Sequence, residues 1–186
     1  VSTTIDKFVY IVLHKFFDKR IQLKYSETEI VDRIDEIKHP VFRESLKIYG
    51  MKNSLEIAVI QDLPKEGGSG LGGSTAFSVG LINALSNFKG ISKSSHQLAE
   101  ESTSLEIDVL KNPIGLQDQY ASAYGGLNYM TFSPSKVEIR PINMNSQIIK
   151  ELESNMLMFY TGITRSANVI LDDLNSNIND ELTLDS

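Results

Sequence analysis

The apolar pattern in the middle of the chain predicts a strand, a glycine-rich loop and a helix in direct succession. Residues 54–63 are rich in β-branched and aliphatic side chains and end at Pro64, which is typical of a strand. A helix is expected to begin near Ser74, because apolar residues recur at helical spacing after it. These residues are Phe77, Leu81, Ile82 and Leu85.

A second helix is predicted directly after the first, with no strand between them. Ser94 is a good N-cap residue, Gln97 stands at capping-box distance, and the helical run continues over Leu98–Leu110. Shorter elements follow toward the C-terminus. They are a helix over Gln117–Tyr124, strands near Leu127–Phe132, Lys136–Pro141 and Met156–Tyr160, and a helix that starts at Ser166.

The N-terminal third predicts a hairpin and then a helical region. The strands Thr3–Leu13 and Ile21–Tyr25 are joined by a turn at residues 17–20. Residues 29–50 are expected to be mostly helical with a break at His39, because the proline that follows disfavours helix in the residue before it. The whole pattern indicates a mixed α and β architecture without repeats.

The glycine-rich loop has the properties of an anion site. Five glycines within residues 67–73 let the backbone take positive φ and let a ligand approach without meeting a Cβ atom. The first amide groups of the helix at Ser74 point back into this loop, and the positive end of the helix dipole favours a phosphate there.

Two common nucleotide motifs fit this loop incompletely. Residues 68–73 satisfy GxGxxG, but a dinucleotide fold then needs a second strand that ends in an acidic residue, and two helices stand there instead. The Walker A pattern is approached by residues 67–74, but Gly73 occupies the position of the lysine that would reach the terminal phosphates.

A third pattern fits better. Pro64 and residues 70–76 resemble the PxxxGLGSSAA loop of the kinase superfamily named after galactokinase, homoserine kinase, mevalonate kinase and phosphomevalonate kinase. Gly73, where a serine is usual, and a longer spacer after Pro64 are departures that remove one hydroxyl and leave the backbone cradle intact. The resemblance implies an ATP site formed by Gly68, Ser69, Gly70, Leu71, Gly72, Gly73, Ser74 and Thr75.

A second segment carries the same resemblance. From Glu106 the chain reads EIDVLKNPIGLQDQYASAYGGLNYM, similar to the family's helix glutamate, NP turn and aspartate before a YGG strand start. The resemblance implies that Glu106 and the Ser74 hydroxyl bind Mg²⁺ and that Asp118 is the catalytic residue facing the substrate hydroxyl. These roles suit the chemistry, since Mg²⁺ takes a few hard oxygens plus phosphates, and phosphoryl transfer needs positioning and charge neutralisation.

Blocks along nearly the whole chain resemble the D-glycero-D-manno-heptose 7-phosphate kinases and the fucokinase-like sugar kinases. The resemblance implies ATP-dependent phosphorylation of a sugar hydroxyl, namely the anomeric one of a heptose 7-phosphate, for bacterial surface polysaccharide. A fucokinase- or galactokinase-like kinase of another sugar, a non-catalytic nucleotide-binding module and an NAD-dependent oxidoreductase are the alternatives. The blocks are residues 4–13, 24–47, 113–128 and 159–167 and the glycine-rich loop.

The resemblance also implies the fold and the domain division. An α+β fold is expected, with residues 1–153 as a GHMP-kinase N-terminal ATP-binding domain of the ribosomal protein S5 domain 2-like type, a mixed sheet with packed helices. Residues 154–186 would begin a ferredoxin-like C-terminal subdomain. The family's first strand and loop and its glycine-rich third motif have no counterpart here, so we expect this chain to carry the central part of the enzyme and not to turn over by itself.

Each candidate residue also has a purely structural interpretation. Ser74 is a suitable helix N-cap, Glu106 could be an exposed helix carboxylate, and Asp118 could cap the short helix that follows it. The three histidines share no metal-ligand spacing.

Composition narrows the function classes further. A net charge of -6 argues against nucleic acid as a partner, and no apolar run reaches the length of a membrane span. The chain has no cysteine, which excludes disulfides and a cysteine nucleophile. We expect a sugar or sugar-phosphate substrate and, because the reaction needs ATP, a cytoplasmic location.

Overall fold

The computed structural model describes residues 1–62 and 70–159. Its main sheet has four strands in the order β2-β5-β3-β4. The edge strand β2 (Val9–Lys15) runs antiparallel to β5 (Leu55–Gln61), which runs parallel to β3 (Ile21–Lys24). The last strand, β4 (Thr28–Val31), is antiparallel to β3. The predicted mixed sheet is therefore confirmed.

Strand pairing corrects two N-terminal predictions. The expected hairpin between the first two strands is wrong, because β5 lies between β2 and β3 and pairs with both. The expected helix over residues 29–50 is also too long. Thr28–Val31 is a strand, a 3₁₀ turn η1 covers Ile34–Glu36, and helix α1 covers only Pro40–Ile48. The break before Pro40 was predicted correctly, since this proline is the first residue of α1.

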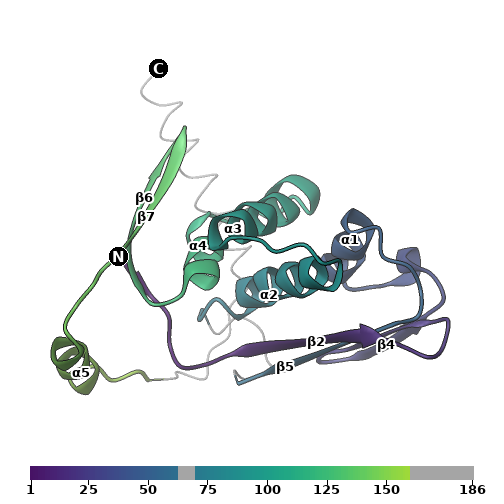
Figure 1. The fold of residues 1–186 in the computed structure, drawn as a ribbon, viewed down its shortest axis with the longest axis horizontal. Helices are drawn as coiled ribbons and strands as arrows, with labels where there is room; N and C mark the ends of the chain where they lie inside the picture. Colours follow the sequence, from purple (N-terminus) through teal and green to yellow (C-terminus); the bar gives the residue numbers. More distant parts are fainter. Residues whose placement is uncertain (63–69, 160–186) are drawn as a thin grey trace, which may run out of the picture.

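Helices cover one face of this sheet in two layers (Figure 1). Helix α2 (Gly73–Phe88) and α1 pack next to the strands, and α2 in turn packs against α3 (Ser95–Thr103) and α4 (Gln117–Tyr124). The predicted start of a helix at Ser74 is thus confirmed to within one residue. The predicted short helix over Gln117–Tyr124 is confirmed with the same bounds. The core lies between the sheet and α1 and α2, and its fully buried side chains include Leu23, Ile57, Phe42, Leu46, Leu81 and Leu85.

The C-terminal half adds a second, smaller sheet. Strands β6 (Leu127–Ser133) and β7 (Lys136–Pro141) form the predicted hairpin, and β1 (Ser2–Thr3) pairs with β6. Helix α5 (Ser146–Ser154), which we did not predict, follows and buries none of its residues. Met156–Phe159 shows no strand, and the predicted helix from Ser166 lies outside the described residues.

Candidate active site

The described part of the glycine-rich loop leads directly into α2. Gly70 and Gly72 have φ of +72° and +70°, a conformation that strains any residue with a Cβ atom. Gly72 is the N-cap residue, and its carbonyl accepts the first helical hydrogen bond from the amide of Ala76 at 2.8 Å. The amides of Gly73, Ser74 and Thr75 precede that hydrogen bond, so they lie at the positive end of the helix dipole.

The predicted phosphate-loop residues divide into three groups. Gly68 and Ser69 lie outside the described residues. Leu71 and Ser74 are exposed beside the glycines, which leaves the Ser74 hydroxyl accessible to a ligand. Thr75 is buried, with 7% of its surface exposed, so its side chain packs into the domain and only its amide is suited to the loop.

The candidate metal ligand Glu106 lies in an unusual helical segment. After the Ser94–Gln97 capping box, which is confirmed, α3 ends at Thr103 and continues as the π-helix η2 (Ser104–Val109). The amide of Leu110 donates to the carbonyl of Leu105, the i→i−5 bond of that geometry, at 3.0 Å. Because π segments are frequent at functional sites, this one is consistent with a functional role for Glu106.

The Glu106 side chain points inward, contrary to the interpretation of an exposed carboxylate. Only 4% of the residue is exposed, and burial raises the pKa of its carboxyl above the ordinary value. Polar side chains of Ser78, Asn112 and Gln119 lower this pKa, and the negative charge of Asp118 raises it again. The Oε1 oxygen of Glu106 has no hydrogen-bond partner among the described residues.

The Glu106 neighbours come from three different elements. Ser78 stands one helical turn after Ser74 in α2, and its hydroxyl donates to the Ser74 carbonyl at 3.3 Å. The turn after η2 folds back so that the amide of Asn112 donates to the Glu106 carbonyl at 2.9 Å. Gln119 is fully buried in α4. In the orientation that satisfies its amide, the nitrogen donates to the carbonyls of Gly115 at 3.1 Å and Leu116 at 3.2 Å.

Asp118 is placed differently from Glu106. It lies in the first turn of α4, is exposed, and accepts no capping hydrogen bond. The N-cap position of α4 belongs to Leu116, so the interpretation of Asp118 as the helix N-cap is wrong. The negative charge of Asp118 raises the pKa of Glu106, and α4 packs against α2. The exposed carboxylate of Asp118 therefore lies close to the buried carboxylate of Glu106.

Sequence reasoning missed Ser78, Asn112 and Gln119. Each had a detectable signal, since Ser78 is four residues after Ser74 on the same helix, Asn112 is the asparagine of the NP turn, and Gln119 follows Asp118 directly.

The donor set around Glu106 fits a magnesium ion. A hard carboxylate oxygen without a partner among the described residues lies near the buried hydroxyl of Ser78, and magnesium prefers one or two carboxylates together with water and phosphate oxygens. Within residues 1–62 and 70–159, no group of three or more His, Cys, Asp or Glu side chains could hold a metal ion. An ion at Glu106 would therefore draw its other ligands from hydroxyls, water and nucleotide phosphates.

Comparison with known proteins identifies the family of this chain. Residues 30–126 match the family described as GHMP kinases N terminal domain. The chain therefore belongs to the GHMP kinases. This confirms the resemblance inferred from the loop and the second segment, and with it the expected α+β fold of the N-terminal domain.

Individual relatives are sugar kinases by name. The D-glycero-alpha-D-manno-heptose 7-phosphate kinase of Campylobacter jejuni is 33% identical over 134 residues, which are 72% of this chain and 39% of that protein. The L-fucokinase/L-fucose-1-P guanylyltransferase of Bacteroides fragilis is 27% identical over 146 residues, 76% of this chain and 15% of that protein. The chain thus spans less than half the length of these curated relatives.

A solved structure gives the same answer for the fold. The crystal structure of a D-glycero-D-manno-heptose 1-phosphate kinase from Bacteroides thetaiotaomicron superimposes with a TM-score of 0.70 at 25% identity and covers 78% of this chain and 51% of that one. Among residues 1–62 and 70–159, no helix is both long enough and apolar enough to cross a membrane.

Proposed function

We propose that the protein is an ATP-dependent sugar kinase that phosphorylates a sugar hydroxyl with Mg²⁺ as cofactor. The substrate we favour is D-glycero-D-manno-heptose 7-phosphate and the acceptor its anomeric hydroxyl, as a step toward nucleotide-activated heptose for bacterial surface polysaccharide. Support for the sugar comes from the names of the relatives described above, of which the heptose 7-phosphate kinase is 33% identical. The need for ATP places the reaction in the cytoplasm.

The observation that carries this proposal is the Oε1 oxygen of the buried Glu106, which has no hydrogen-bond partner within residues 1–62 and 70–159. A buried acceptor left without a hydrogen bond destabilises the fold by about 1–3 kcal/mol, so its retention favours a ligand outside the protein. Two of the surrounding side chains, Ser78 and Gln119, come from α2 and α4, the helices that also begin at the glycine turn and carry Asp118. A non-catalytic nucleotide-binding module would need neither carboxylate.

The roles of the residues follow from their positions. The amides at the start of α2 would bind the nucleotide phosphates together with the turn at Gly70 and Gly72, while Ser74 and Glu106 would hold the ion. The bound ion neutralises charge on the transferring phosphoryl group.

Asp118 is the group we assign to the acceptor. Its exposed carboxylate is free to accept a hydrogen bond from the sugar hydroxyl, to orient that oxygen toward the phosphoryl group and to receive its proton as the new bond forms. Buried Gln119, next to it in α4, holds the start of the helix on the carbonyls of Gly115 and Leu116. This contact would fix the position of Asp118 relative to Glu106.

Phosphorylation of fucose is the alternative that a specific comparison favours. The fucokinase of Bacteroides fragilis matches 76% of this chain but at a lower identity of 27%. Because the described residues include no assigned sugar-binding side chain other than Asp118, the two substrates must be separated by experiment.

A substrate panel tests the proposal. The full-length gene product is incubated with Mg²⁺, ATP and either heptose 7-phosphate, fucose or galactose, and phosphate transfer is followed by phosphorus NMR. We expect transfer to heptose 7-phosphate and a requirement for Mg²⁺. Transfer to fucose instead would support the alternative, and binding of NAD with no transfer to any sugar would refute the kinase.

A further inference from the structure

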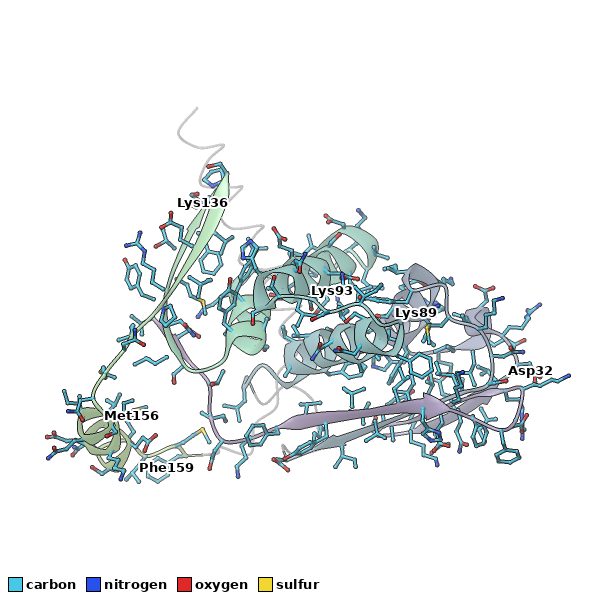
Figure 2. All side chains as sticks on the ribbon, viewed as in Figure 1. Asp32, Lys89, Lys93, Lys136, Met156 and Phe159 are labelled. Atoms are coloured by element: carbon cyan, nitrogen blue, oxygen red, sulfur yellow. The ribbon has the colours of Figure 1, made fainter. Side chains whose placement is uncertain are left out.

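The opposite end of α2 borders a pocket that the kinase proposal does not use. It has a volume of about 330 Å³ and lies where the end of β2, the loop before β5 and the end of α2 meet. A helix of 16 residues is about 24 Å long, so this pocket is about that far from the glycine turn at the other end. Figure 2 shows Lys89 at the end of α2 that lies away from α4.

The lining of this pocket, which we name the Lys52 pocket, combines apolar and basic residues. The apolar ones include Phe16, Met51 and Phe88, and the basic ones, which we call the rim lysines, are Lys15, Lys52 and Lys89. Met51 is buried, whereas Phe88 keeps 38% of its surface exposed and so offers a ring to a ligand. A volume of this size accommodates a single-ring compound with a charged substituent.

The rim lysines have no acidic partners. None of the three forms an ion pair with a carboxylate among the residues that the structure describes, and Lys89 only donates to the carbonyl of Gly50, at 3.3 Å. Two acids of the adjoining strand and turn already have cations of their own, since Asp18 pairs with Arg20 and Glu56 with Lys24 at 2.6 Å. The rim is therefore locally positive in a chain of net charge -6.

The main chain of the loop adds hydrogen-bond donors. The loop is framed by left-handed residues at both ends, Gly50 with φ of +53° and Ser54 with φ of +67°. A serine in this conformation is strained, and such residues are typical of ligand-binding segments. Within the described residues, the amides of Lys52 and Asn53 have no hydrogen-bond acceptor. Free amides and lysines in the lining of one pocket favour an anionic head group.

We propose that the Lys52 pocket binds a small anion that carries an aromatic or heterocyclic ring, with its phosphate on the lysine rim and its ring on Phe16 and Phe88. Apolar contact with the rings supplies affinity, and the lysines and free amides select the charge. This site is separate from the kinase site, so the proposal stands whether or not the sugar kinase assignment holds.

Phenyl phosphate is the probe that tests this proposal. It is titrated into the protein after the candidate nucleotide site has been saturated with Mg²⁺ and a non-hydrolysable ATP analogue, and the amide resonances of Lys52 and Asn53 are followed by NMR. We expect both to shift with phenyl phosphate, more weakly with inorganic phosphate, and not with benzyl alcohol, because charge and ring are both needed.

Charge reversal locates the binding. Lys52→Glu and Lys89→Glu should each weaken phenyl phosphate binding about two- to fivefold, the range of an exposed charged contact. Lys150→Glu makes the same charge change on α5, at the other end of the molecule, and should have no effect (Figure 1). Phe88→Ala should remove the preference for phenyl phosphate over inorganic phosphate. Absence of the amide shifts, or equal weakening in Lys150→Glu, would overturn the proposal.

Discussion

Replacing Glu106 by glutamine tests the buried carboxylate that the kinase proposal depends on. Glutamine keeps the volume but removes the negative charge from a residue that is only 4% exposed and has an unpartnered oxygen. An unsatisfied buried polar group costs about 1–3 kcal/mol. Glutamine leaves a buried polar group at this position but removes the additional cost of burying a charge, so we expect Glu106→Gln to raise the free energy of unfolding by about 1 kcal/mol at neutral pH, although the mutation removes a functional group.

The pH dependence of this gain has a defined sign. Burial raises the pKa of Glu106 in the folded protein above its unfolded value of about 4.3, so the folded state holds the proton more tightly. Below the unfolded pKa the carboxyl is neutral in both states, and the ionisation of Glu106 costs nothing. The cost grows as the pH rises through the folded pKa. The stabilisation by Glu106→Gln should therefore be largest at neutral pH and shrink as the pH falls toward 4.

Urea denaturation followed by circular dichroism measures this difference. Glu153→Gln makes the same change at an exposed position of α5 and should leave stability unaltered. Adding Mg²⁺ and an ATP analogue at about 100 times the dissociation constant should stabilise the wild type by about 2.7 kcal/mol and the Glu106→Gln variant far less. A variant that is less stable than wild type at neutral pH, or that gains equally from Mg²⁺ and nucleotide, would refute the reasoning.

Two further predictions concern the scaffold. Ser94→Ala removes the hydroxyl that accepts a hydrogen bond from the amide of Gln97 at 3.3 Å. It should lower the free energy of unfolding, measured by urea denaturation, by about 1 kcal/mol. Ser92→Ala, at an exposed neighbour, is its control, and equal losses in both would contradict the capping role. Burial lowers the pKa of His39, which is packed among Tyr25, Phe42 and Phe77. The free energy of unfolding should therefore be highest above the unfolded pKa of His39, about 6.5, and should fall as the pH drops toward the lower pKa of the folded state. His39→Phe should reduce this pH dependence. An unchanged pH dependence in His39→Phe would contradict the prediction.

The parts of the fold that sequence predicted are those set by local pattern. The capping box at Ser94, the helix at Gln117–Tyr124 and the hairpin of β6 and β7 depend on residues a few positions apart. Strand partners depend on distant residues, and alternation does not reveal them, so the place of β5 between β2 and β3 was missed.

One buried carboxylate explains the other main error. The predicted helix over residues 29–50 includes Glu29, yet this residue lies in β4 and its side chain is buried. It accepts hydrogen bonds from the Tyr25 hydroxyl at 2.8 Å and from the amides of Lys38 at 2.7 Å and His39 at 3.2 Å. These hydrogen bonds allow the carboxylate to be buried, whereas the residue type alone predicts an exposed side chain.

Residues of the candidate site could be predicted only where they match a position of a family motif. Glu106 and Asp118 came from the resemblance, whereas the burial of one and the exposure of the other follow from how η2 and α4 pack on α2. The contribution of Gln119 depends on its full burial, which no pattern of residue types around it indicates.

The measurement that tests the central claim most directly is phosphate transfer by Asp118→Asn. The variant and the wild type, both as the full-length gene product, are compared for transfer from ATP to heptose 7-phosphate by phosphorus NMR and for binding of an ATP analogue by calorimetry. The account predicts that turnover falls at least about a hundredfold, the range of general acid–base catalysis, while Mg²⁺-dependent nucleotide binding is retained. Unchanged turnover in Asp118→Asn would contradict the account.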